Sequence, residues 1–191
     1  MQLNNSTSEL TAHLVQMPPP QEVVSEPLQA AEALLSSELT PEIMEQVTQE
    51  AQKLPSEAQQ QGITQKELDS LYALAFDLYQ TECFEQAVDI FRLLCFYEPQ
   101  KSKNWIGLGG ALQHTKNHQA ALAAFGMASF YDPLNPAPRF YAAHSLIDIQ
   151  DLPMALASAK AAIELCNHQT DKHNIKSRAT TLSEALQKQL T

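Results

Sequence analysis

Apolar residues recur at helical spacing along most of the chain. Within residues 27–63 this pattern predicts two short amphipathic helices, over residues 27–39 and 41–54, followed by a linker rich in glutamine. A further helix should begin just after Thr64, because Thr64 and Glu67 have the spacing of a capping box. The N-terminal region therefore leads through short helices into a longer helical segment.

The beginning of the chain is acidic and contains a run of prolines. Residues 1–26 include Met17-Pro18-Pro19-Pro20, which cannot continue a helix, so we expect them to form a disordered arm. Residues 1–63 carry nine carboxylates against Lys53 alone, whereas residues 64–191 carry 13 acidic and 11 basic residues. Most of the formal net charge of −10 thus lies in the first third. The absence of a basic stripe argues against a direct nucleic-acid partner.

From residue 68 the chain repeats a pattern of large and small residues with a period of 34. Large residues occupy positions 4, 7, 11 and 24 of the repeat, small residues occupy positions 8, 20 and 27, and proline occupies position 32. The repeat that begins at Ser102 matches at every position: Trp105, Leu108, Gly109, Leu112, Ala121, Phe125, Ala128 and Pro133. The repeat that begins at Leu68 departs only at Leu94, where a small residue is expected. The repeat that begins at Pro136 retains Ala142, Ala143, Leu146, Ala155 and Ala162. It has Arg139 in place of the large residue at position 4 and Asn167 in place of the proline at position 32.

This pattern is typical of antiparallel helix pairs that stack on one another. Small residues at positions 8 and 20 let the paired helices approach closely, and proline ends the second helix before the next pair begins. We therefore predict an all-α tetratricopeptide-repeat (TPR) superhelix over residues 64–168, with repeats at about 68–101, 102–135 and 136–169. Residues 170–191 should add a C-terminal capping helix.

The first helix of the first repeat carries two apolar stripes, although a core needs only one. Leu71, Leu74, Ala75 and Leu78 form the packing stripe. Positions 2, 5, 9 and 12 of a stacked TPR line the concave groove instead. In the three repeats these positions include Asp69, Tyr72, Phe76 and Tyr79, then Lys103, Ile106, Gly110 and Gln113, then Phe140, His144 and Ile147. The aromatic stripe should bury a partner, a second protomer or a neighbouring helix, and the N-terminal helices are the alternative cover.

No residue pattern predicts catalysis, a metal or a cofactor. Gly107-Leu108-Gly109-Gly110 lacks the spacing of a phosphate loop and falls inside a helix, where small residues serve packing. His114 and His118 straddle a turn, so a shared metal is not expected. The cysteines, Cys83, Cys95 and Cys166, are widely separated and should be reduced core thiols. With no signal peptide and no membrane span expected, we predict a cytoplasmic binding protein without enzymatic activity.

Several segments of the repeats form a combination that ordinary TPRs do not carry. The first repeat contains Leu71-Tyr72-Ala73-Leu74-Ala75-Phe76 with Tyr79-Gln80, Phe84-Glu85-Gln86-Ala87, Phe91 and Leu94-Cys95. The second and third repeats contain Trp105-Ile106-Gly107-Leu108-Gly109-Gly110 and Pro138-Arg139-Phe140. These segments resemble the corresponding repeats of the class II chaperones of bacterial type III secretion. Two features differ from the family: Glu82-Cys83-Phe84 stands where Gly-Lys-Tyr is common, and the N-terminal extension is longer than usual.

The resemblance implies a small cytoplasmic bacterial chaperone, monomeric or homodimeric, that keeps hydrophobic translocator proteins soluble and competent for secretion. An extended translocator segment with spaced apolar residues and prolines would lie in the groove. Tyr72, Phe76, Tyr79 and Phe91 match groove residues of the family, and residues 40–54 would mediate dimerisation. The resemblance also leaves open other secretion partners, namely a needle subunit, an effector or a transcriptional regulator. It implies neither a membrane nor a nucleic acid as a direct partner.

Overall fold

The computed structural model describes residues 57–167 and 174–190, and within them it is all-helical. The helices predicted over residues 27–39 and 41–54 lie outside the described part. No helix in that part is both long and apolar enough to cross a membrane. The helices are α4 (Glu57–Gln60), α5 (Gln65–Gln80), α6 (Phe84–Tyr97), α7 (Ser102–His114), α8 (His118–Tyr131), α9 (Pro136–Asp148), α10 (Leu152–Cys166) and α11 (Ile175–Leu190).

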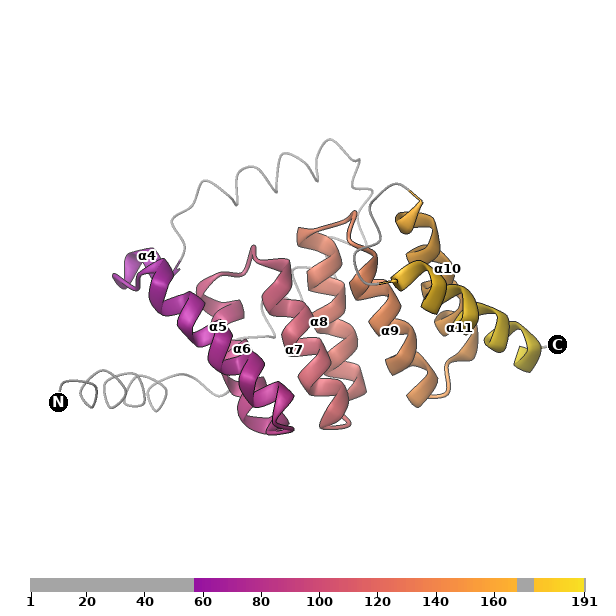
Figure 1. The fold of residues 1–191 in the computed structure, drawn as a ribbon, viewed down its shortest axis with the longest axis horizontal. Coiled ribbons are helices and arrows are strands. Elements are labelled where there is room, and N and C mark those ends of the chain that lie inside the picture. Colours follow the sequence, from indigo (N-terminus) through magenta and orange to yellow (C-terminus); the bar gives the residue numbers. More distant parts are fainter. Residues whose placement is uncertain (1–56, 168–173, 191) are drawn as a thin grey trace. The chain divides into compact units, whose positions relative to one another are not determined.

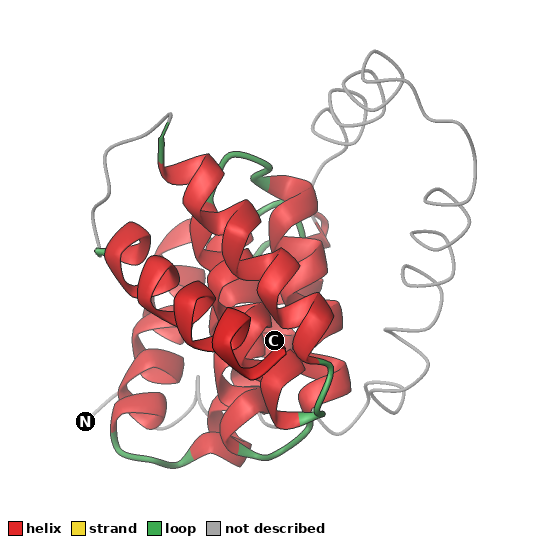
Figure 2. Cartoon of the chain, turned by 90° about the vertical axis from the view of Figure 1, so that its right-hand side faces the viewer, coloured by secondary structure: helices red, strands yellow, loops and turns green. Residues whose placement is uncertain are grey.

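The helices pack as consecutive pairs, as the sequence pattern predicts. Helices α5 and α6, α7 and α8, and α9 and α10 form the pairs, and the second helix of each pair also contacts the helix that follows it. Figure 1 shows this succession along the chain, with α11 packed after α10. Short loops join the paired helices, drawn green between the red helices in Figure 2. The predicted TPR fold is therefore confirmed.

Small residues occupy the helix crossings in every pair. Alanines at positions 8 and 20 are fully buried, and Gly109 takes the same place in α7. A Cβ atom built on Gly109 would lie 2.5 Å from Cε1 of Phe125, which is closer than carbon atoms can approach. Phe125 and its counterpart in the first repeat, Phe91, are each only 1% exposed. The paired helices can approach closely because these positions carry no large side chain, and the buried phenylalanine rings fill the space that remains between the helices.

The turn inside each pair contains one residue with a left-handed backbone. These residues are 34 apart and have φ angles of 63°, 64° and 66°: Glu82, Lys116 and Gln150. In each turn the next residue donates its backbone N–H to the carbonyl five residues earlier: Cys83 to Leu78, Asn117 to Leu112 and Asp151 to Leu146. These are Schellman motifs, which satisfy carbonyl groups at a helix end. None of the three left-handed residues is glycine, the residue that adopts this conformation without steric cost.

The segment that leads into α5 matches one of two local predictions made for it. The capping box is confirmed, because the Thr64 N–H donates to Glu67 Oε2 at 2.8 Å and the Glu67 N–H donates back to the Thr64 hydroxyl. The hydrogen bonds from Thr64 lower the pKa of Glu67. The predicted linker, in contrast, contains the short helix α4. Ala58 of α4 is buried, and α4 contacts α6. Four residues are too few to show helical periodicity in a sequence.

The prediction that Leu74 packs in the core is wrong. Leu74 is 47% exposed, whereas Leu108, which holds the same repeat position in α7, is 5% exposed. Leu108 is covered because α7 packs against α6 of the preceding pair. Within residues 57–167 and 174–190 no helix pair precedes α5, so this position has no equivalent neighbour.

Candidate binding groove

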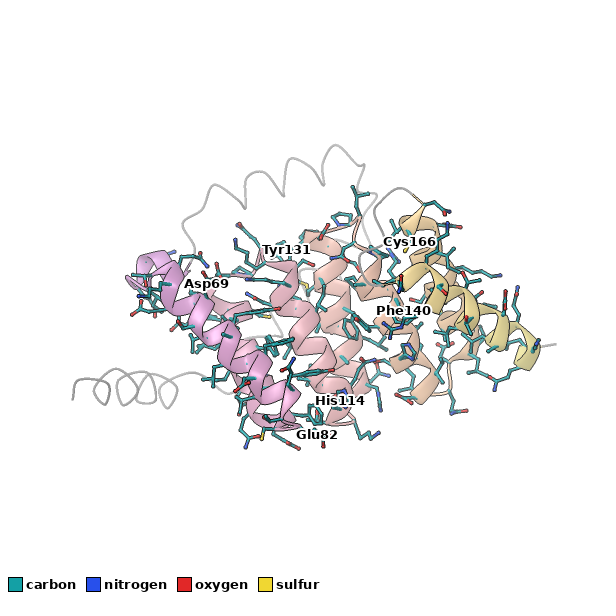
Figure 3. The ribbon with its side chains drawn as sticks, viewed as in Figure 1. Asp69, Glu82, His114, Tyr131, Phe140 and Cys166 are labelled. Carbon is teal, nitrogen blue, oxygen red and sulfur yellow. The ribbon has the colours of Figure 1, made fainter. Side chains whose placement is uncertain are left out.

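The first helices of the three pairs, α5, α7 and α9, carry the groove positions. We call the aromatic part of this surface, made by Tyr72, Phe76 and Tyr79 of α5, the aromatic stripe. Figure 3 labels one residue on each helix that helps to locate the surface: Asp69 on α5, His114 at the end of α7 and Phe140 on α9. Contacts between these helices, described next, join their side chains into one continuous surface.

The aromatic stripe is only partly covered within the described residues. Phe76 is 48% exposed, and Tyr72 and Tyr79 are half-buried. The Tyr72 ring packs edge-on against Phe91, with ring centroids 5.9 Å apart. Burial raises the pKa of the Tyr72 and Tyr79 hydroxyls, so both stay neutral at physiological pH. The stripe thus presents an apolar surface with two neutral hydroxyl groups.

A second set of aromatic contacts fixes Tyr79. Its hydroxyl oxygen lies 3.1 Å from Nε2 of His114, and its ring packs edge-on against Phe84. His114 and Phe84 stack in parallel at 4.1 Å. The ring of Tyr79 also lies against Gly110 of α7, where an added Cβ would be in ordinary contact at 3.5 Å. These contacts hold Tyr79 in one orientation before any partner arrives.

The middle and far parts of the surface are more closely tied to the core. The Gln113 side-chain amide donates to the Tyr141 carbonyl at 2.9 Å and to the Ser145 hydroxyl at 2.8 Å, which links α7 to α9. Ile106 is half-buried. Ile147 is also half-buried and packs against the core cluster formed by α9, α10 and α11.

Two predicted groove residues are instead core residues. Phe91 is 1% exposed and Phe140 is 2% exposed, so neither presents its ring to a partner. Phe91 lies beneath Tyr72, at the interior position of α6. Phe140 belongs to a buried cluster with Ile175 and Ala179, because α11 covers this end of α9. Both rings therefore support the surface from below rather than lining it.

Two cations lie over aromatic rings at this surface. Nζ of Lys103 is 4.3 Å from the centroid of the Tyr72 ring, and Cζ of Arg178 is 4.6 Å from that of Phe140. The pKa of His144 is lowered mainly by burial. The positive charge of Arg178 lowers it further, and the negative charge of Asp148 raises it. His144 itself packs edge-on against Phe140 at 4.9 Å. Sequence reasoning placed Lys103 here but missed Arg178, because only the docking of α11 brings that residue to the surface.

The histidines and cysteines considered in the sequence do not form a metal site among the described residues. His114 ends α7 and His118 begins α8, so the two histidines belong to different helices as expected. His118 Nδ1 instead lies 3.4 Å from an oxygen of Asp148. Among the described residues, no three histidine, cysteine, aspartate or glutamate side chains gather where they could hold a metal ion. All three cysteines are free thiols.

Comparison with known proteins places these features in context. A tetratricopeptide-repeat family model matches residues 68–101. The chain is 28% identical to the low calcium response locus protein H of Yersinia pestis over 124 residues, which are 65% of this chain and 74% of that protein. PcrH of Pseudomonas aeruginosa, solved with the chaperone binding region of PopD, is 27% identical, with a TM-score of 0.66 over 68% of this chain and 98% of that one.

A second solved structure is similar to the same extent. The type III secretion chaperone SycD of Yersinia enterocolitica, in complex with a peptide of the translocator YopD, is 26% identical to this chain. Its TM-score is 0.64, and the match covers 68% of this chain and 98% of that one.

Proposed function

We propose that the chain is a class II (translocator) chaperone of bacterial type III secretion, and that it binds an extended segment of a secreted translocator in its TPR groove. Binding there keeps the translocator soluble and competent for secretion in the bacterial cytoplasm. The chain acts by binding, not by catalysis. The PcrH structure contains the chaperone binding region of PopD, and the SycD structure contains a peptide of the translocator YopD.

The observation that carries this proposal is the exposure of Phe76 between two half-buried tyrosines. An aromatic side chain that is 48% exposed leaves apolar area in water, and covering that area with a partner is favourable. Tyr79 is already held by His114 and Phe84, so little side-chain entropy is lost when a partner binds to it. The stripe is therefore suited to act as the principal contact for apolar side chains of the translocator.

The proposed contact residues follow from exposure. They are the groove residues that the fold leaves at least partly accessible: Tyr72, Phe76, Tyr79, Ile106, Gln113, His144 and Ile147. Structures of SycD include an alternative dimer. We extend the proposal to a homodimer formed through residues 40–54, which lie outside the described part of the chain.

The test uses two exposed apolar residues on opposite sides of α5. Phe76 is 48% exposed and belongs to the stripe, whereas Leu74 is 47% exposed and lies outside it. Phe76→Ala should leave the melting temperature close to that of the wild type, because a half-exposed ring contributes much less to stability than a buried one. At the interface the same truncation should cost about 2 kcal/mol, roughly a thirtyfold loss of affinity. Leu74→Ala should bind like the wild type.

Binding is measured in two stages. Capture from the native host followed by mass spectrometry identifies the partner, and titration with that partner then gives the affinity of each variant. Leu94→Ala, at a fully buried position, provides the stability control and should lose about 2–5 kcal/mol. Equal losses of affinity in Phe76→Ala and Leu74→Ala would contradict the proposed stripe. Capture of a small helical needle subunit, a regulator or an effector, with no translocator, would contradict the proposed partner.

A further inference from the structure

Among the described residues, Lys103 and Arg178 lie at the groove without a carboxylate partner. Within residues 57–167 and 174–190, the side-chain contact recorded for each is the face of an aromatic ring, Tyr72 for Lys103 and Phe140 for Arg178. Asp69, one helical turn before Tyr72 on α5, accepts a hydrogen bond from the Gln65 side chain at 3.1 Å and forms no ion pair with either cation. Within the part of the chain that the structure describes, no carboxylate therefore pairs with either positive charge.

An aromatic face positions a cation but does not neutralise it. The attraction at an exposed site is weak, enough to favour one side-chain position and too little to replace an anion. A carboxylate that approaches Lys103 therefore finds a cation whose position is already restricted, and less side-chain entropy is lost on pairing. The same reasoning applies to the guanidinium of Arg178, which can bind a carboxylate through two parallel hydrogen bonds.

The charge of the rest of the chain makes these two cations distinctive. The formal net charge is −10, so the protein as a whole repels an acidic partner. Lys103 is the only Lys, Arg, Asp or Glu residue in α7, and it lies where α7 meets α5. Arg178 lies where α11 meets α9. Each cation therefore gives an acidic side chain a local attraction at a separate place along the groove.

We propose that Lys103 and Arg178 determine specificity, by pairing with two acidic side chains of the translocator segment that lies in the groove. This inference rests on the proposed function and adds the chemistry of the ligand. The aromatic stripe accepts apolar side chains of the segment, and the two cations select segments that carry carboxylates at the matching positions. A segment with lysine or arginine at those positions is rejected.

The experiment compares charge-removing variants with a matched control. Lys103→Gln and Arg178→Gln remove the proposed contacts, and Lys101→Gln removes an exposed lysine that precedes α7. The probe is a synthetic peptide covering the groove-binding segment of the captured translocator, together with a copy in which its Asp and Glu residues are replaced by Asn and Gln. Thermal melts confirm that each variant is folded before its affinity is measured.

We expect Lys103→Gln and Arg178→Gln each to weaken binding of the acidic peptide about threefold to tenfold at low ionic strength, with smaller effects at high ionic strength. Lys101→Gln should bind like the wild type, and the neutral peptide should bind all three variants equally. If both groove variants bind the acidic peptide as tightly as Lys101→Gln does, the inference is overturned. In that case a continued loss of affinity in Phe76→Ala would leave the proposed function intact, whereas unchanged binding in Phe76→Ala would overturn both.

Discussion

Four helical glycines allow the close packing of the repeats to be measured. Gly107 and Gly109 of α7 lie against buried rings, and a Cβ atom added to them would be 2.3 Å from Phe91 and 2.5 Å from Phe125. A Cβ on Gly110 would be in ordinary contact at 3.5 Å, and one on Gly126 would meet nothing within 4 Å. The same substitution, glycine to alanine, therefore has opposite consequences at positions in similar helices.

The magnitudes follow from two opposing effects. Alanine is better than glycine in a helix by about 1 kcal/mol, so Gly126→Ala should be more stable than the wild type by about that amount, and Gly110→Ala by slightly less. At Gly109 the Phe125 ring must move by about 1 Å in a close-packed interior, and overpacking of this kind costs about 1–3 kcal/mol. Gly109→Ala should thus be about 1–3 kcal/mol less stable than Gly126→Ala, and Gly109→Leu less stable still.

The assay is urea denaturation followed by far-UV circular dichroism. The free energies of unfolding are compared only between variants whose free energy falls with urea concentration at the same slope. A changed slope would indicate a change in the unfolded state or an intermediate. A Gly109→Ala protein as stable as Gly126→Ala would show that the α7 and α8 crossing is not close-packed as described. It would also refute the repeat register, which places Gly109 at the small-residue position.

Two further predictions concern the turns and pH. Because Glu82 has a φ angle of 63°, Glu82→Gly should raise the free energy of unfolding by about 1 kcal/mol, whereas Glu82→Ala, measured in the same thermal melts, should not. No difference between the two variants would exclude steric strain at this turn. Because the pKa of His144 is lowered below its ordinary value of 6.5, the unfolded chain takes up the proton first, and stability should fall as pH drops below about 6.5. In urea titrations at several pH values, His144→Gln should weaken the dependence of the free energy of unfolding on pH. If that dependence is the same as in the wild type, groups other than His144 cause it.

Much of the fold could be predicted because each repeat position has one packing role. Small residues at two positions and a large residue between them specify a helix pair, and the capping box marks where the first long helix begins. The two prominent errors, at Leu74 and Phe140, both lie near the ends of the repeat array. A position pattern assumes a neighbour on each side, and the terminal helices do not have the same neighbours.

The candidate site could be predicted only in part. Spacing places Tyr72, Phe76 and Tyr79 on one side of α5, since residues four and three apart lie on the same helix face. Spacing does not report exposure, which depends on what the later helices cover, and α11 covers Phe140. Arg178 reaches the groove through tertiary packing of α11, so no local pattern could assign it.

The exposed position of Leu74 has a consequence for motion. In a stacked array each helix pair is stabilised mainly by its neighbours, so a pair at the end of the array opens at a lower free energy than one in the middle. Among the described helices α5 lies at such an end, and it carries the stripe that we propose binds the translocator. Backbone amides of α5 should then exchange with solvent sooner than those of α7. The chain would meet its proposed partner at an easily opened end of the described helices, and occupancy of the groove would be detected as slower amide exchange in α5.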